Sequence, residues 1–153
     1  MKTYDISVDS DTFASGTITD RVYYFDFSKL PRGRYSIDWT FQTASIANLL
    51  TLMATGPICV HMDSWTGSYQ YQAAADSCPT HAVFGALVPN WYSATAGMMG
   101  VDLKQNGAIV IDSLPSTNFF TIKLRYGMGT AAPASFARYF MTIELTPLDD
   151  DYI

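Results

Sequence analysis

The sequence has few of the residues that fill exposed helix faces or supply enzyme chemistry. Its 153 residues include one glutamate, Glu144, and two histidines, and charged residues make up 15% of the chain. Glutamate and lysine favour solvent-facing helix positions, whereas the abundant threonine, tyrosine and phenylalanine favour strands. We therefore expect a nearly all-β protein. With 48% hydrophobic residues, the chain has enough material for one continuous core, so residues 1–153 are expected to form a single domain.

Clustered positive charge and long apolar runs are also missing. The net charge is −5, and the nine lysines and arginines are scattered, so we expect no nucleic-acid partner. Arg32 and Arg34 are the nearest approach to a cluster, and a solvated corner explains them better than a phosphate site. No apolar run reaches the roughly 18 residues of a membrane-spanning helix, and the first residues lack the apolar core of a signal peptide. We expect neither a membrane span nor signal-directed export.

Cysteine and histidine are too few to indicate a metal site. Cys59 and Cys78 could form a disulfide, but the missing signal peptide favours reduced thiols. Together with His61 and His81 they supply four donors of the types that bind zinc. The C-x-H and C-x-x-H spacings are not those of a standard zinc site, however, and both histidines are expected at strand ends, partly exposed. We therefore predict no metal and no cofactor.

The clearest positive pattern covers residues 23–41, two strand-like runs joined at a corner formed by residues 30–33. Pro31 cannot donate to a strand ladder, and Gly33 allows the chain to reverse. In the second run, alternate residues form one apolar row, which predicts a strand with one buried face: Tyr35, Ile37, Trp39 and Phe41. A second Leu-Pro corner, Leu114-Pro115, precedes an alternating run at residues 119–126.

Similar patterns predict strands along most of the chain. The expected strands are residues 2–8, 21–27, 34–43, 47–55, 58–63, 81–88, 98–103, 108–111, 119–126 and 138–146. Asn106-Gly107 predicts a hairpin that pairs residues 98–103 with 108–111. Residues 64–80, 90–96 and 127–135 are expected as loops, residues 148–153 as an acidic tail, and no helix of useful length is expected. About eight to ten antiparallel strands predict a β-sandwich or barrel.

No pattern for catalysis is present, so we do not expect an enzyme. The sequence contains no nucleophile elbow, no pair of suitable carboxylates and no glycine-rich phosphate loop. The two aromatic loops, 64–80 and 90–96, are the candidate binding regions. Their rings could contact a partner protein, stack on sugars, or fold back as lids over the sandwich ends. The candidate partner-contact residues are Trp65, Tyr69, Tyr71, Trp91 and Tyr92.

Four segments carry a family resemblance: the aromatic strand ending in LPRGRYSIDWTF, the Asn-Gly hairpin, the strand NFFTIKLRYG and the closing strand ARYFMTIELTPL. Together they resemble the small single jelly-roll proteins associated with the capsids of large double-stranded DNA viruses. They are more distantly similar to complement-type and tumour-necrosis-factor-like domains. The resemblance implies an all-β single jelly-roll sandwich and a non-enzymatic minor capsid, cement or spike-base protein.

Such a protein would be located in the virion, with other capsid proteins and copies of itself as partners. Two alternatives remain open at the level of sequence. One is a carbohydrate-binding β-sandwich module that uses the aromatic loops. The other is a trimeric complement- or tumour-necrosis-factor-like ligand domain, which the missing signal peptide and collagen-like stalk argue against.

Overall fold

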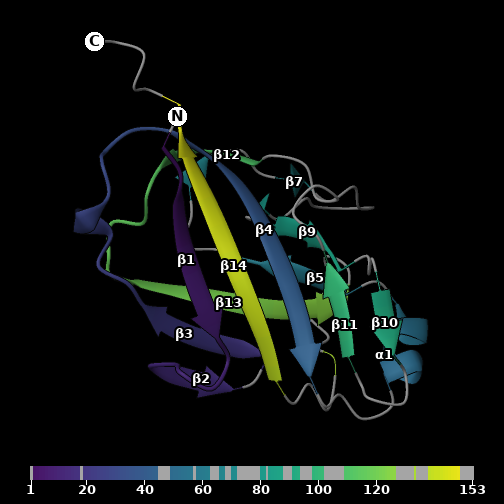
Figure 1. Ribbon diagram of the computed structural model, residues 1–153. Helices are drawn as coiled ribbons and strands as arrows, with labels where there is room; N and C mark the ends of the chain where they lie inside the picture. The colour runs from purple at the N-terminus through teal and green to yellow at the C-terminus, as the bar shows by residue number, and fades with distance from the viewer. Residues whose placement is uncertain are drawn as a thin grey trace.

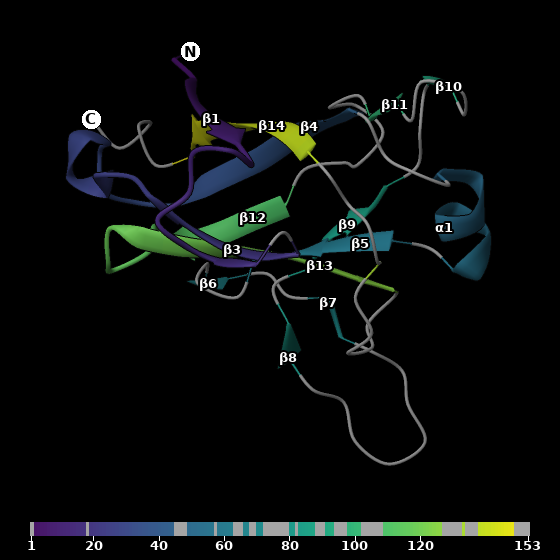
Figure 2. The ribbon, with the colours of Figure 1, turned by 90° about the horizontal axis from the view of Figure 1, so that it is seen from below.

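The computed structural model describes residues 2–17, 19–44, 49–56, 58–62, 66–67, 70–71, 80–81, 83–87, 91–93, 98–101, 109–126, 133 and 138–148. In this part of the chain, two antiparallel sheets lie face to face (Figures 1 and 2). The first sheet has the order β1 (Tyr4–Asp9), β14 (Arg138–Pro147), β4 (Tyr35–Ala44), β11 (Met98–Val101) and β10 (Trp91–Ser93). It also contains β12 (Ile109–Ser113), which pairs with β4 and with β6 (Thr66–Gly67).

The second sheet has the order β2 (Ser15–Thr17), β3 (Asp20–Tyr24), β13 (Phe119–Tyr126), β5 (Ile58–His61) and β9 (Val83–Ala86). A separate small sheet pairs β7 (Gln70–Tyr71) with β8 (Thr80–His81). Two short helices complete the described elements, a 3₁₀ helix η1 (Phe27–Lys29) and an α-helix α1 (Leu49–Thr55).

The strand pairing is nested. β1 pairs with β14, β3 with β13, β4 with both β11 and β12, and β5 with β9, so early strands pair with late ones. Successive pairs in this series alternate between the first and the second sheet. A long antiparallel ribbon wrapped into two sheets in this way is a jelly roll. The predicted fold class, a single jelly-roll β-sandwich, is confirmed.

The core lies between the two sheets. The predicted row on β4 is fully buried, and the facing strand β13 contributes alternate residues as well: Phe120, Ile122 and Leu124. On β14, Met141, Ile143 and Leu145 are also buried, while Glu144 lies on the outer face, opposite Asp5 of β1 and Asp38 of β4. The alternating pattern of the sequence therefore predicted correctly which face of β4 is buried.

The first corner differs from its prediction. The strand predicted over 21–27 ends at Tyr24, and Phe27 begins η1 instead. Asp26 caps this 3₁₀ helix, because its Oδ1 accepts hydrogen bonds from the Ser28 backbone N at 3.1 Å and from Ser28 Oγ at 2.6 Å. Phe27 remains buried, so the turn changes the path of the chain without removing this ring from the core. Gly33 has a φ of 130°, which confirms that glycine is needed for the reversal.

The strand predicted over 47–55 is wrong in the part that the structure describes. Residues Leu49–Thr55 form α1, which lies at one end of the sandwich (Figure 2). Leucine, methionine and alanine are strong helix formers, and Leu52 is buried while Thr51 and Ala54 are exposed. A helix therefore buries one side of this apolar run, and the predicted strand is replaced by α1.

The hairpin predicted at Asn106-Gly107 is also wrong. β11 pairs with β4 through Gly100 and Gln42, and β12 pairs with β4 through Ile109 and Ile37. Both strands are antiparallel to β4 and follow each other along the same edge, so neither pairs with the other. Since β4 is ten residues long, its edge accommodates both short strands. The turn residues themselves lie outside the described residues.

The predicted loops are partly strands. Within 64–80, the described residues form β6, β7 and the first residue of β8, and within 90–96 they form β10. The run predicted at 81–88 contains the end of β8 and all of β9. Most of the loop 127–135 and residues 149–153 of the tail lie outside the described part of the chain.

Candidate functional site

The structure distributes the predicted partner-contact aromatics over different elements. Trp91 and Tyr92 lie on β10, the outermost strand of the first sheet, where they pair with Gly100 and Met99. Tyr71 lies on β7 of the small sheet, opposite Thr80. Trp65 and Tyr69 lie outside the described residues. The five residues are therefore not placed on one sheet, and their role as partner contacts stays a prediction.

The two Leu-Pro corners, which the sequence showed only as similar, come together around one cavity of about 530 Å³. The first corner connects β3 to β4 and the second connects β12 to β13, so each crosses from one sheet to the other. We call this cavity the corner groove. It is lined by Phe27, Ser28, Leu30, Arg32, Gly33, Ser113, Leu114, Pro115, Ser116 and Asn118.

The corner groove has an apolar floor and a polar rim. Phe27 and Pro115 are buried, and Leu30 and Leu114 are half-buried. The serines that line the second corner, Asn118 and Arg32 are exposed. Small-molecule and peptide sites commonly combine an apolar lining with a few polar groups in this way.

Hydrogen bonds hold the two corners in place. The Phe25 backbone N donates to the Asn118 carbonyl oxygen at 2.9 Å, which ties the first corner to the second. The Tyr35 hydroxyl donates to the carbonyl oxygen of Pro31, so the first residue of β4 fixes the turn that precedes it. The groove is thus built on backbone anchored at both ends by the sandwich.

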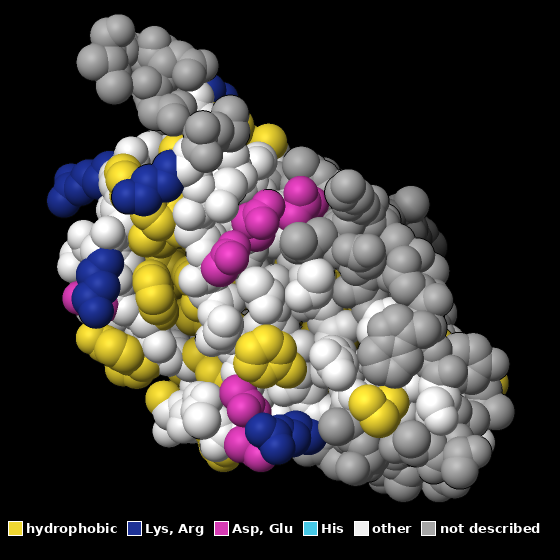
Figure 3. Space-filling model, in the orientation of Figure 1, with side chains coloured by type: hydrophobic (Ala, Val, Ile, Leu, Met, Phe, Trp, Pro, Cys, Tyr) yellow, Lys and Arg dark blue, Asp and Glu magenta, His cyan; other side chains and the backbone are white. Residues whose placement is uncertain are grey.

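Positive charge gathers on the first corner. Lys29, Arg32 and Arg34 lie within six residues of a chain whose net charge is −5, and all three are exposed. The nearby acid Asp26 accepts the hydrogen bonds of Ser28, which lower the pKa of this carboxyl. Figure 3 shows lysine and arginine side chains bordering the hydrophobic side chains on this flank of the molecule. Of these three cations, Arg32 lines the groove, so the groove combines a positive charge at its rim with an apolar floor.

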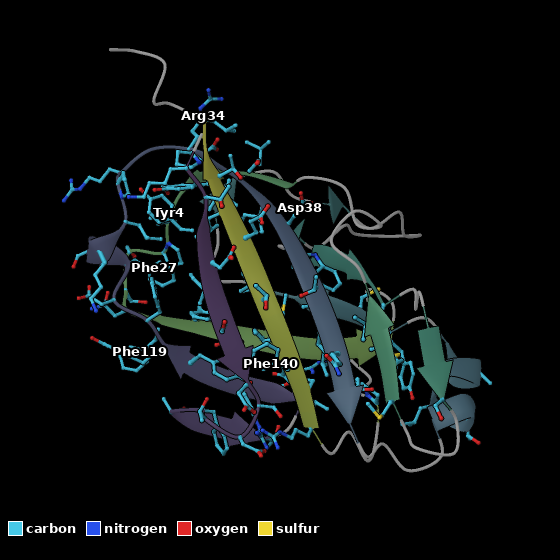
Figure 4. The ribbon with its side chains drawn as sticks, in the orientation of Figure 1. Tyr4, Phe27, Arg34, Asp38, Phe119 and Phe140 are labelled. Carbon is cyan, nitrogen blue, oxygen red and sulfur yellow. The ribbon has the colours of Figure 1, made fainter. Side chains whose placement is uncertain are left out.

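An exposed aromatic pair lies beside the second corner. Tyr24 of β3 and Phe119 of β13 are direct cross-strand partners, with ring centroids 5.5 Å apart in an edge-to-face arrangement. They are 60% and 48% exposed, respectively. Their neighbours Tyr23 and Phe120 point into the core, so Tyr24 and Phe119 project from the outer face of the second sheet. Figure 4 labels Phe119 on the flank that also carries Phe27.

Alternation in the sequence could have found this pair, because Phe119 precedes the buried row that begins at Phe120. This pair is not among the partner-contact residues predicted from the sequence, which all lie in the two aromatic loops. The corner groove was missed for a different reason, since residues of its two walls are separated by some 80 positions.

The two cysteines and two histidines, which the sequence analysis considered as zinc donors and rejected, are only partly described. Cys59 and His61 lie on β5, and His61 is 3% exposed, so the expectation of a partly exposed histidine is wrong for this residue. His81 lies on β8 of the small sheet, while Cys78 lies outside the described residues. No group of three potential metal ligands is found among the residues that the structure describes.

Two buried tyrosines join the sheets across the core. Tyr23 of β3 and Tyr139 of β14 have their hydroxyl oxygens 2.8 Å apart. Burial is the main cause that raises the pKa of both phenols. Their contact is a structural link in the interior, and neither tyrosine is among the residues that line the corner groove.

Comparison with known families found no family model that matches this chain, and comparison with curated proteins found no significant sequence match. Within the described residues, no helix has the length and apolar character needed to cross a membrane.

Proposed function

We propose that this chain is a non-enzymatic structural protein of a virus particle, a minor capsid, cement or spike-base subunit. In this proposal it acts in the virion through contacts with other capsid proteins and with copies of itself. The observation that carries the proposal is the exposed aromatic pair Tyr24 and Phe119. Large rings in mutual contact on a protein surface are typical of interface anchors, because tyrosine and phenylalanine are enriched in the cores of interfaces.

The jelly-roll fold is compatible with a capsid role, and it also occurs in proteins of other functions. Jelly rolls occur in capsid proteins, but also in lectins and cupins, so fold alone does not assign a function. The sparse charge of the chain adds support, since interface cores are depleted in charged residues. A single solvent-exposed ring would need no explanation, whereas two touching rings on one rigid sheet form a contiguous apolar surface.

The test compares the oligomeric state of three proteins by analytical ultracentrifugation. The wild-type chain is expected to self-associate when its concentration is raised to about 100 μM, because a complex with a micromolar Kd is largely formed at that concentration. The double variant Tyr24→Ser/Phe119→Ser should remain monomeric. The matched control is Phe140→Ser, which removes a ring that is 45% exposed on the outer face of the other sheet and should leave association unchanged.

Mass spectrometry of purified particles provides the second measurement. A wild-type protein that stays monomeric over this range and is absent from virus particles would overturn the proposal. Binding to a glycan array that is lost in Trp65→Ala or Trp91→Ala would favour the carbohydrate-binding module instead.

A further inference from the structure

We propose that the free edge of β1 is a docking site for an extended segment of another protein, in which basic and apolar residues alternate. The segment would add a strand to the first sheet beside β1. This inference goes beyond the proposed function and does not depend on it, because it rests on the backbone of β1 and not on the exposed aromatic pair.

β1 is the outermost strand of the first sheet. It pairs with β14 on one side, and no strand of the described residues lies on its other side (Figure 1). Its six residues pair with β14 without a register shift, so this edge is regular. At the edge of the second sheet, β2 has only three residues, and a φ of 103° at Gly16 interrupts its extended backbone. β1 is therefore the better template for a further strand.

The register determines which backbone groups of β1 are free. The Ser10 backbone N donates to the Tyr139 carbonyl oxygen at 3.0 Å, which continues the register of β1 and β14 by one pair. In an antiparallel pair, every second residue bonds to the neighbouring strand, and the residues between them direct their N–H and C=O groups away from it. Counting back from Ser10, Asp5 and Ser7 present these groups at the free edge.

The turn after β1 agrees with this assignment. The Asp9 carbonyl oxygen accepts hydrogen bonds from the Thr12 backbone N at 2.9 Å and from Thr12 Oγ1 at 3.1 Å, so it faces away from β14. The N–H and C=O groups of Asp5 and Ser7 have no such partner among the described residues. Unpaired backbone groups in a row are the feature to which extended peptides bind when they add a strand to a sheet.

The side chains of β1 define what an added strand must carry on each face. Ile6 and Val8 are buried, whereas Asp5 and Ser7 are exposed. Residues opposite each other on neighbouring strands share a face of the sheet. An apolar residue beside Ile6 would therefore extend the buried face, and the residue opposite Asp5 would lie on the outer face. Residues Tyr4–Asp9 contain neither proline nor lysine, which commonly protect an edge from pairing.

The charge beside the edge favours a basic segment. Asp5 lies opposite Glu144, and Glu144 lies opposite Asp38, so three acids form a row across the outer face that ends at Asp5. Figure 3 shows acidic side chains in a row on this face. Like charges directly opposite each other destabilise a sheet, and none of the three acids has an ion pair with another described residue. A lysine or arginine opposite Asp5 would offset this repulsion.

A second copy of β1 would fit this edge poorly. Antiparallel pairing centred on Ser7 would place Asp5 of one copy opposite Asp9 of the other, and pairing centred on Asp5 would place two Asp5 carboxylates opposite each other. Other nearby registers still bring the acidic rows of both copies to the shared edge. We therefore assign the edge to a basic partner.

The test measures binding of a fluorescent peptide of about six alternating lysine and valine residues, the length of a typical strand, by anisotropy at low salt. Wild-type protein should bind it saturably with a Kd below about 1 mM. The control peptide has the same composition with its lysines grouped before its valines. It should bind about fivefold more weakly, because its basic and apolar residues no longer lie on separate faces of a strand.

Ser7→Pro tests the backbone pairing. Proline removes the outward N–H of this residue and is tolerated on a strand edge, so the variant should fold and bind the alternating peptide about tenfold more weakly, as expected for a lost hydrogen bond. The matched control is Ser7→Ala, which keeps the N–H and should bind like wild type. Thermal unfolding checks that both variants are folded.

Amide hydrogen exchange of the wild-type protein gives a measurement that needs no variant. The amides of Asp5 and Ser7 should exchange fast in the free protein and slowly when the alternating peptide is bound. Those of Ile6 and Val8, which face β14, should be protected in both states.

Two charge variants locate the basic residues of the peptide. Asp5→Asn should weaken binding about threefold, as expected for an exposed charge pair. Asp112→Asn removes the same charge on β12, which lies on the other side of β4, and should have no effect. Raising the salt concentration should reduce the difference between these two variants, since it screens the charges.

Any of four results would overturn the proposal: no saturable binding by wild type, equal affinity for the two peptides, unchanged affinity in folded Ser7→Pro, or unchanged exchange of the Asp5 and Ser7 amides. Equal effects of Asp5→Asn and Asp112→Asn would also contradict it, because they would show an effect of net charge alone.

Ultracentrifugation separates this inference from the proposed function. Association of the Tyr24→Ser/Phe119→Ser variant that Ser7→Pro abolishes would assign the edge to a second copy and overturn the proposal. Peptide binding by a protein that stays monomeric would support the docking site even if the proposed function fails.

Discussion

Alkaline pH should destabilise this protein through the Tyr23–Tyr139 pair. The two phenols are buried, and their hydrogen bond connects β3 of one sheet to β14 of the other. Burial raises the pKa of Tyr139 strongly, and its contact with Tyr23 raises it further. Burial likewise raises the pKa of Tyr23 above the ordinary value of 10.0, partly offset by the hydrogen bond with Tyr139. A phenolate at this position would lie in the core between two apolar sheets.

The direction of the pH effect follows from these shifts. Below pH 10 both phenols are protonated in the folded and unfolded states, so they add no pH dependence. Above pH 10 the unfolded chain releases its tyrosine protons while folded Tyr139 keeps its own. The free energy of unfolding should therefore fall by about 1.4 kcal/mol per pH unit for this tyrosine. The stabilisation is complete below pH 10 and is lost as the pH rises toward the folded pKa.

Urea unfolding between pH 8 and about 11.5, followed by circular dichroism, measures this dependence. Tyr139→Phe should lower stability at pH 8 by about 1 to 3 kcal/mol, because it leaves the buried Tyr23 hydroxyl without its partner. The same variant should show a flatter loss of stability above pH 10. The double variant Tyr23→Phe/Tyr139→Phe should cost less than the sum of the two single changes, because it removes both polar groups.

Tyr24→Phe is the control, because its ring is on the surface, and it should keep the wild-type pH dependence. An unchanged alkaline slope in Tyr139→Phe would refute the argument, as would single-variant costs that simply add in the double variant.

Three further predictions concern the fold. Trp39→Ala should lower the free energy of unfolding by about 3 to 5 kcal/mol, because this side chain is fully buried on β4; an unchanged melting temperature would contradict its place in the core. Gly33→Ala should lower the free energy of unfolding, measured by chemical denaturation, by about 1 to 2 kcal/mol, because φ is 130° at this position and L-residues avoid this region. Gly56→Ala is the control and should lower it less, because its added Cβ would lie 3.7 Å from Tyr126 Cδ1, an ordinary contact distance. The hydrogen bonds from Arg125 hold the pKa of Asp20 below its ordinary value of 3.8, so this carboxylate stabilises the fold above pH 3.8 and ceases to do so as the pH falls through its folded pKa. Asp20→Asn should therefore flatten the loss of stability in an acid titration, and a wild-type acid profile would count against the ion pair.

Local periodicity predicted the parts of this fold in which burial alternates along one strand. The inner row of β4, from Tyr35 to Phe41, and the strand β13 are examples, because a strand with one buried face repeats every two residues. Periodicity failed at residues 49–55, where the run is apolar almost throughout. A buried strand and a short helix packed on one side give similar patterns for such a run, and packing against the end of the sandwich decided between them.

The Asn106-Gly107 prediction failed because hairpin formation also depends on the competing strand edges. A turn sequence stabilises a two-stranded pairing locally, but β4 offers a ten-residue edge that both β11 and β12 use. Pairing to a long central strand gives each short strand a rigid partner within the larger sheet. Local turn chemistry alone does not contain this information.

The position of the corner groove follows from the nested pairing of the jelly roll. Since β3 pairs with β13 and β4 pairs with β12, the β3–β4 and β12–β13 connections must cross between the sheets side by side. The resemblance of the two Leu-Pro corners is visible in the sequence, yet their contact requires the pairing of strands whose partner residues are 72 to 103 positions apart. The topology thus joins a basic corner to an apolar, serine-lined one, and neither corner alone would form the groove. A groove at this position is therefore a property of the fold's connectivity, while the positive charge beside it comes from Lys29, Arg32 and Arg34.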